Sequence, residues 1–189
     1  MTIAARIVGR DYSGEGTLFV QADGEDVKVA EDALEFWLMD EGRTVYYNYR
    51  HHKSGYEAEG HGLMRYDVES GEKEVVFEDD LLIVEVMEAK SLGGRTALIV
   101  EMEDGGLGAP LVAVADPGRG RVFRQNFSTV VEVGDGKITV GSYSIETIAD
   151  RDGSGLPSPE STEVFDLDEL LERDADREIL FPWPPGEGE

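Results

Sequence analysis

Cysteine is absent from the sequence, and histidine occurs only three times in 189 residues. The missing cysteines exclude disulfide bonds, thiolate nucleophiles and cysteine-ligated zinc, and they leave the redox compartment open. No apolar run approaches the roughly 20 residues that a membrane-spanning helix needs, and residues 1–10 lack the apolar segment of a secretory signal. We therefore expect a cytoplasmic protein without a membrane partner, or a secreted one if a leader has been removed.

Basic residues are also scarce, because 17 Lys and Arg stand against 41 Asp and Glu, for a formal net charge of -24. This balance argues against nucleic acids and anionic membranes as partners, since they would be repelled. The acidic residues are spread through every segment, as on a solvated surface adapted to salt. Two further hypotheses stay open: an acidic surface that binds a basic protein or imitates nucleic acid, and sites for divalent cations.

A pattern is present twice, about 50 residues apart. Gly42-Arg43-Thr44 and Gly94-Arg95-Thr96 each open an apolar run. Later runs in each copy flank an Asp-x-x-x-Gly turn: Leu63–Asp67 and Val75–Phe77 in the first, Leu111–Asp116 and Val122–Phe123 in the second. The repetition predicts a supersecondary unit that is stacked on copies of itself, because one such unit cannot bury its own apolar face.

The apolar segments are short and bounded by Gly, Asp, Asn or Ser, which predicts an all-β fold of antiparallel hairpins. The expected strands are Thr17–Gln21, Val27–Val29, Leu34–Met39, Arg43–Arg50, Leu63–Asp67, Lys73–Phe77, Leu81–Val84, Ala97–Val100, Leu111–Ala115, Arg121–Phe127, Thr129–Val133, Lys137–Ile145 and Thr162–Leu167. Leu34–Met39 also fits a helix, but the second copy has an Ile- and Val-rich segment at that place, which favours a strand.

Periodicity also predicts which faces are buried. The continuous apolar runs Leu81–Val84, Ala97–Val100 and Leu111–Ala115 are typical of strands covered on both faces. In Arg43–Arg50, one aromatic face alternates with a more polar face that includes Asn48. After the strands, helical spacing predicts a short C-terminal helix from about Leu167, capped by Asp166 or Asp168.

The turn Tyr66–Glu72 resembles those between the outer strands of β-propeller blades of the TolB or quinoprotein type. This partial resemblance, over about half of the chain, implies blades at Leu34–Asp80 and Leu81–Phe127, an irregular third blade from Ser128, and an incomplete fourth before Ala33. Known propellers have four or more blades, so a smallest ring, an open stack, a sandwich and a barrel all stay open. Propellers host enzymes, scaffolds and inhibitors, so the resemblance implies no reaction.

All three histidines fall in one expected connection. His51, His52 and His61, with Glu59, offer imidazole and carboxylate ligands of the kind that bind zinc. Adjacent His51 and His52 point to opposite faces of an extended chain, which opposes their sharing one ion. The two hypotheses are a site made of His61, one of the pair and Glu59, and ordinary solvated histidines.

A second candidate metal site is the segment 150–155. Its oxygen-bearing residues Asp150, Asp152 and Ser154 alternate and are followed by Gly155, as in a calcium loop. The twelfth position is Ser161, where a calcium loop has a bidentate glutamate, and two prolines interrupt the segment. A calcium site and an ordinary polar loop both stay open.

Catalytic motifs are lacking: the sequence has no Gly-x-Ser-x-Gly elbow and no phosphate-binding Gly-Lys-Ser/Thr. No catalytic residue is assigned, and calcium or zinc are the only candidate cofactors.

The C-terminal residues 182–189 form a proline-rich tail beyond a single domain of residues 1–181. Trp183 in this tail either binds a partner protein or packs back on its own domain.

The leading hypothesis is a non-enzymatic, acidic binding protein that acts on a protein partner through its loops and its acidic surface. The alternatives are a metal-binding protein or metal-dependent hydrolase, and an inhibitor or immunity-type protein against a basic partner.

Overall fold

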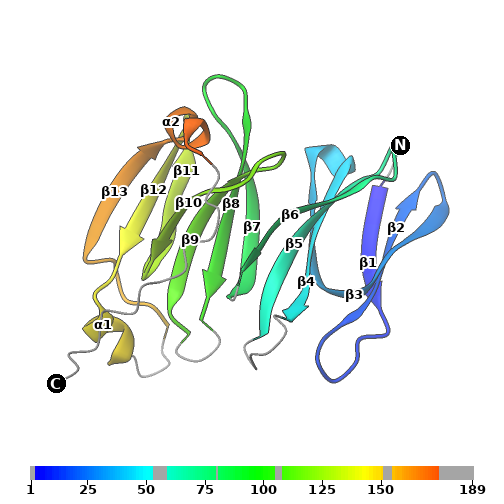
Figure 1. Ribbon diagram of the computed structural model, residues 1–189, viewed down its shortest axis with the longest axis horizontal. Coiled ribbons are helices and arrows are strands. Elements are labelled where there is room, and N and C mark those ends of the chain that lie inside the picture. Colours follow the sequence, from blue (N-terminus) through cyan, green and yellow to red (C-terminus); the bar gives the residue numbers. More distant parts are fainter. Residues whose placement is uncertain (1–2, 53–58, 80, 105–107, 151–154, 175–189) are drawn as a thin grey trace.

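A computed structural model describes residues 3–52, 59–79, 81–104, 108–150 and 155–174. Over these residues the fold is all-β, with antiparallel sheets of six, four and three strands that do not close into a ring (Figure 1). No helix in these segments is long and apolar enough to cross a membrane.

The first sheet follows chain order. Its strands are β1 (Ile3–Val8), β2 (Gly16–Ala22), β3 (Glu25–Met39), β4 (Thr44–His52), β5 (Glu59–Asp67) and β6 (Lys73–Asp79). A short 3-10 turn, η1 (Asp40–Gly42), joins β3 to β4. The N-terminal part of β3 pairs with β2 and its C-terminal part with β4, so this strand belongs to two successive units.

The other two sheets are simple meanders. The second contains β7 (Leu82–Lys90), β8 (Thr96–Glu103), β9 (Pro110–Asp116) and β10 (Gly120–Asn126), and the third contains β11 (Ser128–Gly134), β12 (Lys137–Ser142) and β13 (Ser161–Asp166). Helix α1 (Ile145–Ala149) lies between β12 and β13, and α2 (Leu167–Glu172) follows β13. We call the C-terminal half of β3 with β4–β6 unit 1, β7–β10 unit 2, and β11–β13 unit 3.

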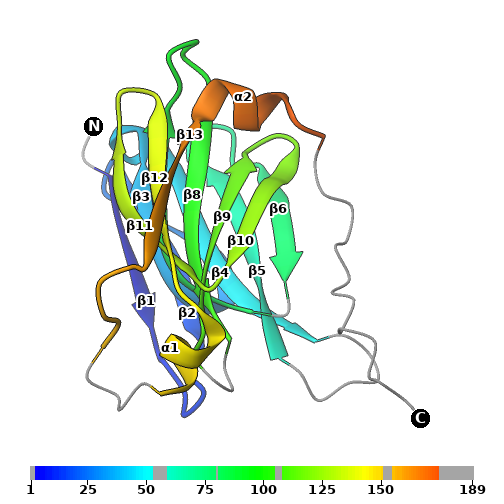
Figure 2. The same ribbon diagram turned by 90° about the vertical axis from the view of Figure 1, so that its left-hand side faces the viewer.

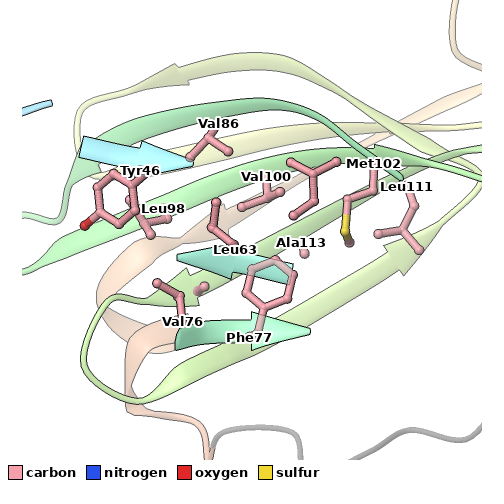
Figure 3. Packing of buried hydrophobic residues seen from close by; sticks show 12 residues of the cluster. Tyr46, Leu63, Val76, Phe77, Val86, Leu98, Val100, Met102, Leu111 and Ala113 are labelled. Atoms are coloured by element: carbon pink, nitrogen blue, oxygen red, sulfur yellow. The ribbon is translucent and has the colours of Figure 1, made fainter. Parts of the chain in front are cut away.

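The units pack on one another through their faces. Unit 1 contributes Tyr46, Leu63 and Phe77 to a cluster that unit 2 completes with Val100 and Met102 (Figure 3). A second cluster joins unit 2 to unit 3 and to the buried leucines of α2. Unit 2 is therefore covered on both sides, which explains why its central strands β8 and β9 are almost wholly buried and apolar.

The repeated turns of the sequence have repeated geometry. Gly42 and Gly94 have φ values of 90° and 80°, and Gly71 and Gly120 have φ values of 74° and 96°. These values lie in the left-handed region that favours glycine. The recurring glycines thus mark the same two bends in units 1 and 2.

Most of the predicted strands are confirmed, and so is the choice of a strand for Leu34–Met39, which belongs to β3. The predicted strand Lys137–Ile145 is too long: β12 ends at Ser142, and the Ser144 hydroxyl accepts a hydrogen bond from Thr147 N–H and caps α1. Strand β1 lies in a segment to which no strand was assigned.

One prediction about faces is wrong. Val84 is 51% exposed, because it lies at a free sheet edge rather than between two faces. On β4 the more polar face is buried as well as the aromatic one: Tyr46, Tyr47 and Asn48 are all at most 4% exposed, since unit 1 packs against neighbours on both faces. The predicted C-terminal helix is confirmed as α2, with the Asp166 carboxylate capping its first turn.

Candidate functional site: the first-strand edge

The first strand of each unit carries the same short pattern. The pattern is an apolar residue, an aliphatic residue, a glutamate and a second apolar residue. It occurs as Ala33-Leu34-Glu35-Phe36, Ile83-Val84-Glu85-Val86 and Val130-Val131-Glu132-Val133. The register to the second strand shifts by one residue inside each of these segments, between Ala33 and Phe36, between Ile83 and Glu85, and between Val130 and Glu132. Each segment is therefore a β-bulge, which bends the strand and re-aims its side chains.

These bulges lie on free sheet edges. Within the described segments, β7 and β11 pair on one side only, and the β2 partner of β3 ends at Ala33, before the bulge. In Figure 2, β3 and β11 lie along one side of the molecule and β6 and β10 along the other. We call the free edges of the C-terminal half of β3, of β7 and of β11 the first-strand edge.

The glutamates of the first-strand edge are exposed in all three units, whereas the aliphatic residue before each glutamate is exposed in units 2 and 3 only; in unit 1 it is Leu34, which is 8% exposed. Glu35, Glu85 and Glu132 are all exposed. Val84 and Val131 beside two of them are 51% and 50% exposed. The edge thus presents a carboxylate from each unit, together with apolar surface and unpaired backbone groups.

A polar side chain on the second strand faces the bulge in units 1 and 2. Asn48 pairs with Leu63 and Glu101 pairs with Val112, and each of these partners lies four residues before the aspartate of the repeated turn. Asn48 and Glu101 therefore occupy equivalent positions. Because both lie in largely apolar strands, their polar groups need hydrogen bonds within the protein.

Asn48 is 1% exposed, and both the oxygen and the nitrogen of its amide form hydrogen bonds. Its Oδ1 accepts a hydrogen bond from the Glu35 N–H of the bulge at 2.6 Å, and its Nδ2 donates to the Ile83 carbonyl of unit 2 at 3.3 Å. One side chain thus holds the bulge of unit 1 and connects it to unit 2.

Glu101 makes the corresponding connection between units 2 and 3. Its Oε1 accepts hydrogen bonds from the Val130 N–H at 2.9 Å and from the Thr129 hydroxyl at 3.0 Å. Val130 lies directly before the bulged Val131, so the bulge of unit 3 is anchored by a carboxylate of unit 2.

The edge glutamates differ in their neighbours. Glu35 forms an ion pair with Arg10, with 3.2 Å between Nη2 and Oε1. Within the described segments no ion pair is recorded for Glu85 or Glu132. Glu85 also stands opposite Glu101 in register, so two acidic residues are neighbours on this strand pair.

His61 takes part in the same connection between units. Its Nδ1 accepts a hydrogen bond from the Ile83 N–H at 2.9 Å and lies 3.2 Å from Asn48 Nδ2. In this arrangement Nδ1 is the acceptor nitrogen, and a neutral ring carries its proton on Nε2. The geometry gives His61 a structural role that the sequence did not reveal.

The other predicted metal ligands stay untested. The backbones of His51, His52 and Glu59 pair at the far end of the β4–β5 hairpin, and their side chains lie outside the described part of the structure. In the calcium-like segment, Asp150 is the C-cap of α1, whereas Asp152 and Ser154 lie outside the described residues, as does Trp183. In the segments that are described, no group of three or more His, Asp or Glu is placed to hold a metal.

A polar hollow of about 490 Å³ lies away from the first-strand edge, at the β5–β6 turn. Arg65, Lys73 and several acidic side chains line it. Arg65 already contacts Asp67 and Glu74, at 4.0 and 3.7 Å, and Lys73 donates to the Val29 carbonyl. Its charges are therefore largely matched within the chain.

The stacked antiparallel units, each with a bulged first strand, define a β-propeller-like protein. No family model and no curated protein matches the chain.

Solved structures do match. The β-propeller domain of the Trilobed protease from Pyrococcus furiosus, which has an open velcro topology, is similar with a TM-score of 0.53 and 11% identity, over 75% of this chain and 46% of that chain. Acylaminoacyl peptidase from Pyrococcus horikoshii is similar with a TM-score of 0.51 and 14% identity, over 74% of this chain and 26% of that chain. The chain spans less than half of either protein, and such identities show the fold alone.

The sequence contained a signal for this site that the prediction missed. The residues Leu34-Glu35, Val84-Glu85 and Val131-Glu132 recur at intervals of 50 and 47 residues. Alignment of the units on their first strands, instead of on their Gly-Arg-Thr segments, would have revealed the pattern.

Proposed function

We propose that the chain is a non-enzymatic binding protein whose first-strand edge binds a basic, extended segment of a partner protein. The observation that carries this proposal is the recurrence of an exposed glutamate at the bulge of all three units. A fold needs bulges to bend its strands, but it does not need a carboxylate at each of them.

The chemistry of the edge selects the partner. Free strand edges offer backbone N–H and C=O groups to an added strand, and carboxylates favour lysine or arginine on that strand. Val84 and Val131 favour apolar side chains between the basic ones. The net charge of -24 attracts a basic partner at long range and raises its association rate.

An inhibitor or immunity-type role is one form of this proposal, in which the basic segment belongs to an enzyme. The finer assignment to the TolB or quinoprotein type also stays a proposal, since it rests on the Tyr66–Glu72 turn alone.

The test uses a peptide of about twelve alternating lysine and valine residues and measures its dissociation constant by calorimetry at low salt. The variant combines Glu35→Gln, Glu85→Gln and Glu132→Gln. A peptide strand added to one of the three edges meets one of these glutamates, so each edge loses one exposed charge pair at roughly 0.2–1 kcal/mol. This predicts binding that is weaker by up to about fivefold.

A matched control combines Glu69→Gln, Glu72→Gln and Glu169→Gln, three exposed residues that do not lie on first strands. It changes the net charge equally and is expected to change binding little. Equal losses in the two variants would show that only the overall charge matters, and the proposal would be wrong.

A further inference from the structure

The two ends of the stack both have a free strand edge. Among the residues that the structure describes, β1 at one end pairs only with β2, and β13 at the other end pairs only with β12. Unit 3 has three strands in the described residues, and β13 is the third. In units 1 and 2 the third strands, β5 and β9, each pair with a fourth strand, β6 or β10. The edge of β13 is thus the position where units 1 and 2 carry one more strand.

The two edge strands match in length and in apolar surface. Each has six residues. Val8 on β1 is 47% exposed and Val164 on β13 is 59% exposed. A pairing of the two strands would satisfy the free backbone groups of both edges and would place each valine beside a neighbouring strand.

Their charges are complementary. Residues 3–10 contain Arg6 and Arg10 and no acidic residue, although both arginines also form ion pairs within the chain. Residues 160–169 contain five acidic residues and no basic one. The basic end of one molecule therefore suits the acidic end of another, in a protein that otherwise repels itself.

Their directions fit as well. In Figure 1, β1 runs down from the N-terminus at the top, and β13 runs up from the side of α1 to α2. In a second copy that has the same orientation, β1 therefore runs antiparallel to β13 of the first copy. The two strands lie at opposite ends of one molecule, so the pairing joins two copies.

From these features we propose that a second copy of the chain adds its β1 to β13, as the fourth strand of unit 3. The contact is heterologous, because it joins two different surfaces, and it repeats from copy to copy into open-ended chains. It uses the ends of the stack and is independent of the first-strand edge.

The experiment is sedimentation equilibrium of the whole chain over a range of concentrations in about 1 M KCl, where the Debye length of roughly 3 Å screens the net charge. The expected result for the wild type is an average mass that rises steadily with concentration. A wild type that stays monomeric would overturn the proposal, and it would point to a segment of the same chain on the β13 edge.

Proline variants identify the edges, because proline removes the backbone donor that the added strand needs. Neighbouring residues of a strand direct their N–H groups to opposite sides. One residue of each neighbouring pair therefore directs its N–H to the free edge, and the other directs it to the partner strand. Both variants of a pair are made: Glu163→Pro and Val164→Pro on β13, and Ala4→Pro and Ala5→Pro on β1. In each pair, we use the variant whose melting temperature equals that of the wild type, because its proline leaves the hydrogen bonds within the sheet intact.

Each chosen variant alone is expected to be monomeric, since it lacks one of the two surfaces. An equimolar mixture of the β1 and β13 variants is expected to form dimers and nothing larger, since only one intact β1–β13 pair can form. Val75→Pro on β6, at a site that is 52% exposed, is the control and is expected to associate like the wild type if it folds. Association of the single variants, or a monomeric mixture, would contradict the proposal.

Discussion

At the scale of single residues, the most buried ion pair of the described segments joins unit 1 to unit 2. Asp79, at the end of β6, has 3% of its side chain exposed and accepts hydrogen bonds from Arg121 and Arg124 of β10. The Arg121 side chain is itself 8% exposed. Loss of one member of such a group leaves a buried charge without compensation, which costs more than the intact pair contributes.

Asp79→Ala is therefore expected to lower the free energy of unfolding by about 3–5 kcal/mol, as measured by urea denaturation. The control is Asp26→Ala, which removes the carboxylate of an exposed pair with Arg6 and is expected to change stability little. Similar losses of unfolding free energy in the two variants would show that burial of the ion pair does not determine its contribution.

Buried tyrosines make stability depend on alkaline pH. Burial raises the pKa of Tyr46 and of Tyr47 to about 12, and burial together with a hydrogen bond to Glu78 raises the pKa of Tyr49. In the unfolded chain a tyrosine has a pKa near 10. Their contribution to stability is thus complete below about pH 10.

The melting temperature is expected to fall as pH rises from about 10 to 12, because the unfolded chain releases the phenolic protons first. Tyr47→Phe removes one of these groups and should make the fall shallower. If the melting temperature of this variant depended on pH as that of the wild type does, the buried Tyr47 would not contribute to the loss of stability at alkaline pH.

At the scale of elements, the connections between units depend on side chains that reach from one sheet to the backbone of the next. Asn48 donates to the Ile83 carbonyl, His61 accepts from the Ile83 N–H, and Glu101 accepts from the Val130 N–H. Each connection meets a first strand beside its bulge. The bulges are consequently fixed at the same points at which the units are joined.

Hydrogen exchange at the Val130 amide tests this connection. Glu101→Ala removes its acceptor and should reduce protection, whereas Glu101→Gln keeps an oxygen at that place and should retain most of it. Equal exchange rates in the two variants would show that the carbonyl-type oxygen at position 101 does not hold the bulge.

Strand identity was predictable from the sequence where apolar runs lie between turn residues, as in Ala97–Val100 and Leu111–Ala115. Comparison of the two repeats also resolved Leu34–Met39. The helix α1 was missed because it is only five residues long and its cap, Ser144, follows directly on a strand pattern. The role of His61 was out of reach, since only the stacking of unit 2 on unit 1 brings Ile83 to its ring.

At the scale of the whole molecule, the net charge of -24 opposes folding and self-association alike. Part of this charge lies at the open edges of the stack, because the β13 end and the first-strand edge both carry carboxylates. Screening should therefore stabilise the protein without any specific ion.

The melting temperature is expected to rise steadily with KCl, and CaCl2 or ZnCl2 at equal ionic strength should give a similar rise. A large rise at low concentration with calcium or zinc alone, reversed by a chelator, would instead support a metal site at His51, His52 and His61 or at Asp150, Asp152 and Ser154.

The central claim, that the first-strand edge is the binding surface, is tested most directly by NMR. The alternating lysine and valine peptide is titrated into the ¹⁵N-labelled protein, and the amide shifts are mapped. The account predicts the largest shifts in the C-terminal half of β3, in β7 and in β11, around Glu35, Glu85 and Glu132. Shifts confined to β6 and β10, or spread evenly over the acidic surface, would contradict it.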